Sequence, residues 1–93
     1  MLAEELATLA GTSAVTLVAA MTTDAWDGIR SGISRLFGHS GEARQHAVEI
    51  QLDSNAQLVA QADDKDRARR SLIGLWTLEL EKLLSQRVIQ AVA

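Results

Sequence analysis

The chain has 93 residues, a net charge of −3 at pH 7 and an apolar fraction of 47%, which together describe one small domain with a thin core. The absence of cysteine excludes disulfides, thiolate metal sites and a cysteine nucleophile, and the absence of proline removes the strongest helix breaker. The negative charge argues against nucleic-acid binding, which needs a positive field to neutralise phosphates. The chain does contain a run of arginines, Arg67, Arg69 and Arg70, but Asp63, Asp64 and Asp66 lie beside it and nearly cancel its charge.

The first predicted helix covers residues 2–22. Leu2, Leu6 and Leu9 repeat at helical spacing, and both glutamates of the segment lie in the first turn, where the helix dipole stabilises negative charge. Residues 6–23 carry no charge and approach the length of a membrane-spanning helix, although threonine, serine and glycine dilute their apolar character. We therefore expect a helix buried against protein, with membrane attachment through 6–23 as the alternative.

A second, shorter helix is predicted over 24–37. Its apolar residues repeat at spacings of three and four, as in an amphipathic helix: Trp26, Ile29, Ile33 and Leu36. Thr23 or Asp24 offers an N-cap, and Gly38 is placed as the C-terminal cap. Ser40 offers the N-cap of the helix that follows, so we expect a tight turn between the two helices.

Two stripes run along the helix predicted over 42–62. The first, spaced by four, three, four and three residues, consists of Val48, Leu52, Asn55, Val59 and Ala62. The second has the same spacing and consists of Ala43, Ala47, Ile50, Ser54 and Gln57. The stripes lie about 120° apart, so they predict two neighbours for this helix rather than one. Asn55 can fix the register of a helix pair; the alternative is a position at the stripe edge in contact with water.

The last helix is predicted over 64–91, after a break capped by Asp63 or Asp64. Because neither glycine nor proline lies near this break, a single continuous helix over 42–92 is the alternative.

The apolar surface of this last helix is broader than one partner helix covers. One face follows helical spacing and consists of Leu72, Ile73, Trp76, Leu80, Leu83 and Leu84. Leu75 and Leu78 fall outside that face, on the flank that carries Lys82. Since so short a chain has few helices with which to cover this surface, the pattern favours self-association.

One set of side chains on the third predicted helix has metal-ligand spacing. Carboxylates and an imidazole repeat there on one side of the helix: Glu42, His46, Glu49 and Asp53. The chain has no second such set, so a metal site would require a dimer, and we expect neither a metal nor a cofactor. His39 and Ser40 are neighbours without an orienting acid or an oxyanion site, so no catalytic residue is predicted.

Three stretches resemble segments of small all-helical proteins from high-GC, actinobacterial-type bacteria that have no assigned activity. They are TTDAWDGIR at 22–30, ISRLFG at 33–38 and LIGLWTLELEKLL at 72–84. The preference for arginine over lysine and the abundance of alanine are similar too. The resemblance extends over most of the chain, but it includes no catalytic signature and therefore implies no activity for any residue.

Together these patterns predict an all-α protein, a single domain over 1–93 that forms a hairpin or bundle of three to four helices completed by self-association. The predicted function is that of a non-catalytic, cytoplasmic interaction or assembly subunit, whose coiled-coil-like partner is a second copy or a larger protein. We expect the interface residues to be Val48, Leu52, Asn55, Val59, Leu72, Trp76, Leu80 and Leu83. The alternatives are a membrane-attached subunit that uses 6–23 and a metal-binding helical dimer.

Overall fold

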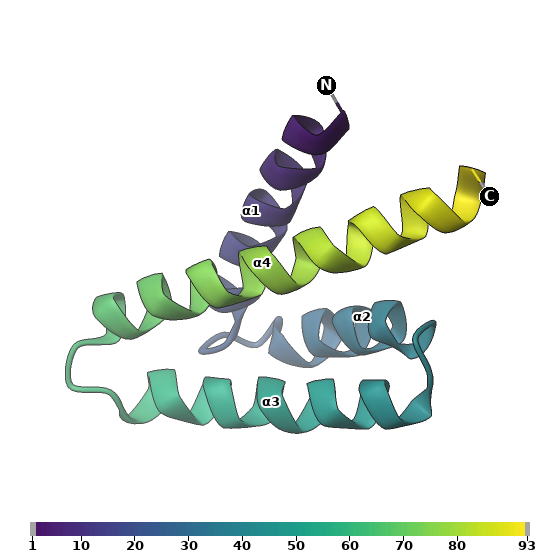
Figure 1. Ribbon diagram of the computed structural model, residues 1–93. Coiled ribbons are helices and arrows are strands. Elements are labelled where there is room, and N and C mark those ends of the chain that lie inside the picture. Colours follow the sequence, from purple (N-terminus) through teal and green to yellow (C-terminus); the bar gives the residue numbers. More distant parts are fainter. Residues whose placement is uncertain (1, 93) are drawn as a thin grey trace.

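The computed structural model describes the backbone of residues 2–92 and the side chains of residues 2–89. Within this range the chain forms helices and no strand (Figure 1): α1 Leu2–Ala20, α2 Trp26–Gly38, α3 Glu42–Gln61 and α4 Lys65–Val92. Each helix begins and ends within two residues of the range that the sequence predicts. The predicted all-α bundle is confirmed, and the periodicity of the sequence explains why the prediction succeeds.

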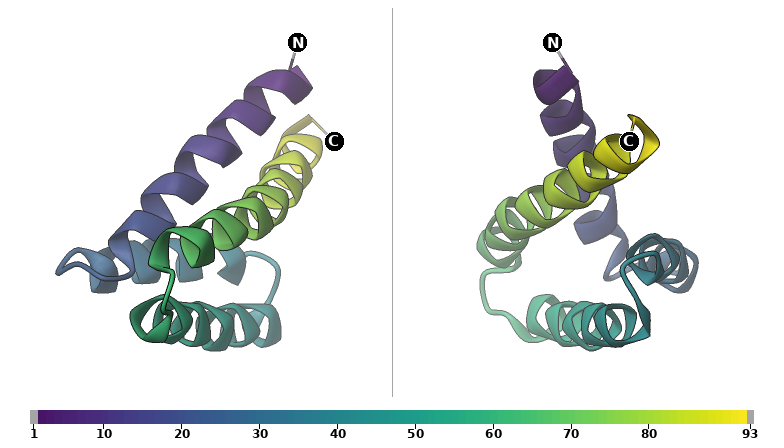
Figure 2. Two further views of the ribbon diagram at one scale, coloured as in Figure 1. Left: turned by 90° about the vertical axis from the view of Figure 1, so that its left-hand side faces the viewer. Right: turned by 45° about the vertical axis from the view of Figure 1, so that its right-hand side comes forward.

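The helices are arranged as two pairs. α1 packs mainly against α4, and α2 packs mainly against α3. Figure 1 shows α2 and α3 side by side, with α4 running above them and α1 crossing behind α4. The views in Figure 2 show that the start of α1 and the end of α4 lie at the same end of the molecule, which measures 46 × 30 × 18 Å. The outer parts of α1 and α4 therefore extend beyond the α2–α3 pair.

All four helices contribute to one core. The largest fully buried side chains are Trp76, Leu17, Leu52, Val18, Val48 and Val59. Ala10 and Ala14 of α1 are fully buried as well, and their small side chains let α1 approach α4 closely. Each large apolar side chain buried in this way stabilises the fold by about 1.5–3 kcal/mol, which offsets the entropy lost when the helices order.

The connections around α2 differ from the predicted caps. Gly41, not Ser40, occupies the N-cap of α3, with φ of 113°, a left-handed conformation that favours glycine. Gly38 is the last helical residue of α2 rather than a left-handed cap beyond it. At the start of α2 the N-cap is Ala25; the Thr23 hydroxyl accepts the Ala25 N–H at 3.2 Å in the preceding turn. These three cap predictions around α2 were wrong because side-chain type alone does not reveal which residue adopts the required backbone angles.

The break between α3 and α4 is stabilised on both sides. Ala62 is extended, with ψ of 140°, and ends α3. The Asp64 carboxylate accepts the Arg67 N–H at 3.0 Å, which is the hydrogen bond of an N-cap. The Lys65 ammonium donates to the carbonyls of Val59 and Ala60 at 3.2 and 2.8 Å, so it pairs with the negative end of the α3 dipole. α3 and α4 are therefore two helices rather than one.

Candidate functional site

The apolar residues predicted to form an interface lie in the core of the chain itself. Each of them is at most 5% exposed: Val48, Leu52, Val59, Leu72, Trp76, Leu80 and Leu83. They pack against α1 and α2 within one cluster. A second copy cannot contact them while the chain stays folded, so the structure gives these side chains a role in folding. The helical periodicity was sufficient to identify them as buried, but it does not distinguish an internal partner helix from an external one.

Asn55 also has a partner within the chain. Its side-chain oxygen accepts the Trp76 indole N–H at 2.9 Å, and the ring of Phe37 meets Trp76 edge to face with centroids 6.2 Å apart. A buried indole N–H without an acceptor is destabilising, so Asn55 satisfies a donor that the core needs. This polar contact aligns α3 with α4 inside one chain. From the sequence, Asn55 was expected either to fix the register of a pair of associating helices or to contact water.

Two of the carboxylates with metal-ligand spacing on α3, Glu49 and Asp53, lie beside an arginine of α2. Arg30 of α2 forms a bidentate pair with Asp53, with N–O distances of 2.6 and 2.9 Å, and lies 3.8 Å from Glu49. The hydrogen bond from Arg30 lowers the pKa of the Asp53 carboxyl below its ordinary value, and Asp53 in turn raises the pKa of Arg30. Among the residues that the structure describes, no three histidine, aspartate or glutamate side chains are grouped so that they could hold a metal ion.

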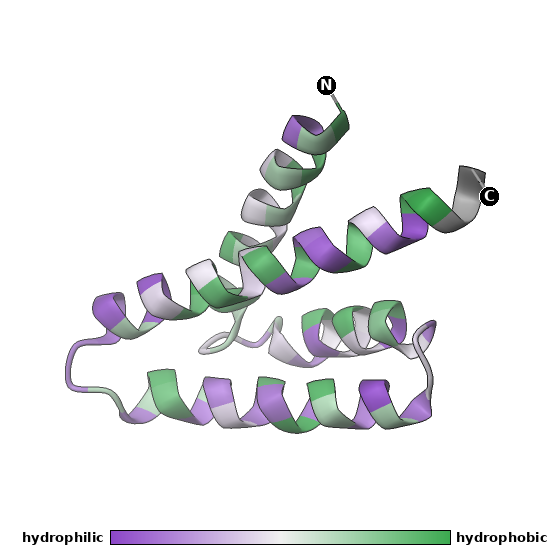
Figure 3. Cartoon of the chain, in the orientation of Figure 1, coloured by the Kyte–Doolittle hydropathy of each residue, from purple (hydrophilic) through white to green (hydrophobic). Residues whose placement is uncertain are grey.

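Several large apolar side chains stay exposed on the outer sides of α3 and α4. On α3 every residue of the second predicted stripe is exposed, and Ile50 is 57% exposed. On α4 Leu75 and Leu78, which the sequence placed outside the main face, are 39% and 65% exposed. Figure 3 shows hydrophobic and hydrophilic residues alternating along both helices. The sequence therefore identified surface that the chain does not cover, although it did not single out Leu58, which is 54% exposed.

α1 combines a buried side with an apolar exposed side. By length and composition Leu2–Ala20 could cross a membrane. Its inner side supplies Ala10, Ala14, Leu17 and Val18 to the core, whereas Leu2, Leu9 and Val15 are each about half exposed on the outer side. The core helix of a soluble protein and a membrane-spanning helix share this length and composition.

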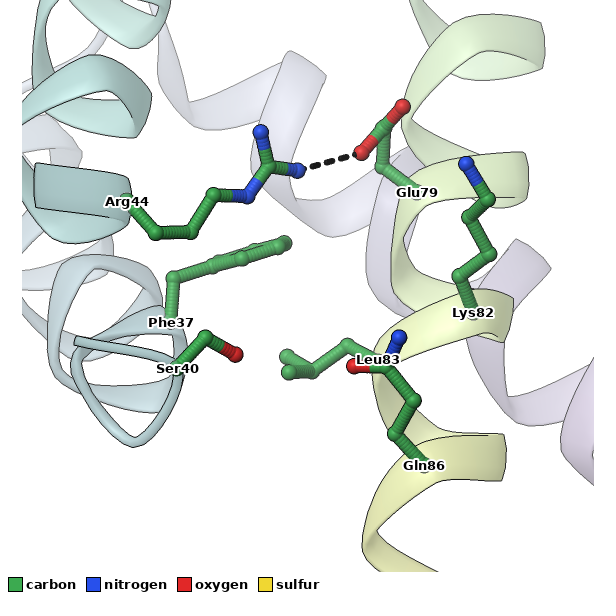
Figure 4. A pocket seen from close by; sticks show the side chains of 7 residues that line it. All are labelled: Phe37, Ser40, Arg44, Glu79, Lys82, Leu83 and Gln86. Atoms are coloured by element: carbon green, nitrogen blue, oxygen red, sulfur yellow. Dashed lines mark hydrogen bonds and ion pairs between the residues drawn. The ribbon is translucent and has the colours of Figure 1, made fainter.

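A pocket of about 450 Å³ lies between the α2–α3 turn and the middle of α4 (Figure 4). It is lined by Phe37, Ser40, Arg44, Glu79, Lys82, Leu83 and Gln86, and we call it the α2–α4 pocket. Arg44 donates to the Glu79 carboxylate at 2.7 Å, and its guanidinium lies 5.3 Å from the centre of the Phe37 ring. Sequence reasoning missed this site because Arg44 and Glu79 are 35 residues apart and no local spacing connects them.

The α2–α4 pocket carries a local excess of positive charge. Arg44 and Lys82 supply two cations, and Glu79 supplies the one carboxylate among the lining residues. Lys82 has no ion-pair partner in the part of the chain whose side chains are described. A positive pocket in a chain of net charge −3 favours anions over cations at this place.

A second hollow of about 450 Å³ lies between α1 and α2, and none of its lining residues is charged. Gly28, Gly32 and Ile33 line its α2 side, and Thr12 and Thr16 line its α1 side. We call it the α1–α2 groove. It has no side chain that would orient a charged ligand, so it provides an apolar comparison for the α2–α4 pocket.

Comparison with known proteins finds no matching family model, no matching curated protein and no matching solved structure. The function is therefore argued from the geometry of the chain.

Proposed function

We propose that the protein is a non-catalytic helical module that associates with a second copy of itself through the outer side of α4. The observation that carries this proposal is the exposure of Leu75 and Leu78, which are 39% and 65% exposed although the same helix buries four other large apolar residues. Association would remove this apolar surface from water at about 25 cal/mol per Å².

The exposed side of α4 has the spacing of a helix-pairing seam. Residues follow one another at intervals of four and three from Ser71 to Ile89, in the order Ser71, Leu75, Leu78, Lys82, Ser85 and Ile89. This is the repeat by which two helices interlock side chains along a common line. The buried side of α4 is used by the core, so the seam is free to meet another chain.

A second copy fits this seam in an antiparallel register. When Leu75 lies opposite Leu78 of the second copy, four leucines meet at the twofold axis. The same register sets Lys82 opposite Ser71 of the second copy, so no like charges face each other. Gly74 borders the seam with open space beside it, which allows the two helices to approach closely.

The test is the native mass of the full chain in solution, for the wild type and for Leu78→Asp. We expect a dimer for the wild type and a folded monomer for Leu78→Asp, because a buried carboxylate at the centre of the seam is unfavourable. The matched control is Leu9→Asp, which alters a leucine 52% exposed on α1 and should leave the dimer intact. A wild type that stays monomeric at high concentration, or equal dissociation by both variants, contradicts the proposal.

The second candidate function is a membrane-attached subunit that uses the apolar segment over 6–23. The length and composition of α1 favour it, as do the half-exposed Leu2, Leu9 and Val15. Insertion would withdraw Ala10, Ala14, Leu17 and Val18 from the core and leave the inner side of α4 without its main partner. Recovery of the full chain in the soluble fraction without detergent counts against this candidate.

A further inference from the structure

We propose that the α2–α4 pocket binds a small amphipathic carboxylate, an anion with an aromatic or short aliphatic body. The pocket brings together a lysine that is unpaired among the described side chains, an arginine with spare donors and a buried apolar floor, from three separate parts of the chain. Figure 4 shows these side chains bordering one common hollow. All lining residues come from one chain, and the pocket shares Lys82 with the α4 seam of the dimer proposed above.

The charges of the pocket select a singly charged anion. Arg44 has five N–H donors and makes one hydrogen bond among the described residues, to Glu79, so its other donors are free for a ligand oxygen. Lys82 lies one turn beyond Glu79 on α4 and forms no ion pair with a carboxylate of residues 2–89. A ligand carboxylate can therefore bridge Lys82 and Arg44 without breaking the Arg44–Glu79 pair. A doubly charged phosphate would meet the nearby Glu79 carboxylate and is disfavoured.

The floor of the pocket selects a ligand with an apolar body. Phe37 and Leu83 are 2% and 4% exposed, and both line the hollow. Ser40 and Gln86 add a hydroxyl and an amide at the rim, which can orient a polar group of the ligand. A volume of about 450 Å³ lies within the range of ordinary small-molecule sites and is sufficient for one aromatic ring with a short acidic side chain.

The experiment is an NMR titration of the ¹⁵N-labelled full chain with phenylacetate. We expect saturable shifts at the backbone amides of Ser40, Arg44, Lys82 and Gln86. The uncharged probe 2-phenylethanol should bind at least about fivefold more weakly, because it lacks the group that Lys82 and Arg44 recognise. Inorganic phosphate should also bind more weakly than phenylacetate, because it leaves Phe37 and Leu83 without an apolar contact.

Two variants alter the pocket in opposite directions. Lys82→Met should weaken phenylacetate binding at least about fivefold, since it removes a charged donor from a partly exposed site. Glu79→Gln should strengthen binding by about twofold to fivefold, because it removes the pocket's carboxylate and releases Arg44. The matched control is Arg70→Gln, which removes one positive charge from an exposed position on the same helix and should leave binding unchanged.

Three outcomes would overturn the proposal. The first is the absence of saturable shifts at the pocket amides, and the second is an equal effect of Lys82→Met and Arg70→Gln. The third is a set of shifts centred on Gly28 and Gly32, which would place the ligand in the α1–α2 groove through its apolar body alone. The native mass of each variant is measured in parallel, so failure of the dimer and failure of ligand binding are recorded separately.

Discussion

Two polar side-chain contacts connect consecutive helices through residues that are 21 and 23 positions apart in the sequence. Asn55 accepts the indole N–H of Trp76 at 2.9 Å, and Asp53 forms a bidentate pair with Arg30 of α2. The first satisfies a donor of a fully buried ring, whereas the second lies at the surface, where the Asp53 side chain is 57% exposed. The buried hydrogen bond therefore contributes more to the specificity of packing, and the surface ion pair adds a small, pH-dependent amount to the free energy of unfolding.

The Arg30–Asp53 pair predicts a loss of stability in acid. Because folding lowers the pKa of Asp53, its contribution is present above the ordinary aspartate pKa and disappears as pH falls through the lowered value. We expect Asp53→Asn to reduce the free energy of unfolding at pH 7 by less than about 1 kcal/mol, since the side chain is mostly exposed. The difference from wild type should shrink below about pH 4, as measured by urea unfolding across pH.

The control for this measurement is Asp63→Asn, because Asp63 has no ion pair among the described residues. Its effect on the free energy of unfolding at pH 7 should be small, because the substitution breaks no ion pair. If Asp53→Asn instead lowered stability equally at neutral and acid pH, the loss would come from the altered side-chain geometry rather than from charge.

At the scale of the helices, the junction between α3 and α4 is held by neighbouring residues of opposite charge. Asp64 caps the start of α4, and Lys65 binds the last carbonyls of α3. These contacts satisfy backbone groups that a helix end otherwise leaves to water. They explain how the chain breaks here without glycine or proline.

Removal of the Asp64 cap should destabilise the protein measurably. We expect Asp64→Ala to lower the free energy of unfolding by about 1 kcal/mol, because the Arg67 N–H loses its acceptor. Asp64→Asn should retain most of the stability, since asparagine caps helices as well as aspartate does. The midpoint of chemical denaturation measures both variants. Equal losses for alanine and asparagine would show that the charge, rather than the capping hydrogen bond, is what matters.

At the scale of the whole molecule, two leucines can have different roles because one lies where helices meet and the other does not. Leu52 of α3 is fully buried, whereas Leu78 of α4 is 65% exposed. Both belong to apolar patterns at helical spacing in the sequence. Tertiary packing is therefore what separates a residue needed for folding from one available to a partner.

This difference predicts contrasting effects of the same substitution. Leu52→Asp should destabilise the fold by at least about 3 kcal/mol and abolish cooperative unfolding, because it removes core packing and buries an unpaired carboxylate. Leu78→Asp should leave the circular dichroism and thermal transition of the monomer nearly unchanged. A folded Leu52→Asp monomer would contradict the placement of Leu52 in the core.

The sequence by itself determined the four helices and the apolar side of each, since backbone hydrogen bonds and the 3.6-residue period are local properties. It also identified surplus apolar residues such as Ile50, Leu75 and Leu78, because residues that fall outside the main stripe are visible without coordinates. These features required no knowledge of which helices meet.

Only the tertiary structure decided which helices pack against each other. It paired α1 with α4 and placed Val48 and Leu80 inside the chain rather than between chains. It also joined Arg44 to Glu79 across 35 residues to form the α2–α4 pocket. The physical reason is that an apolar stripe in the sequence shows only that one side of a helix is unfavourable in water. Which surface covers that side depends on how the connected helices pack in three dimensions.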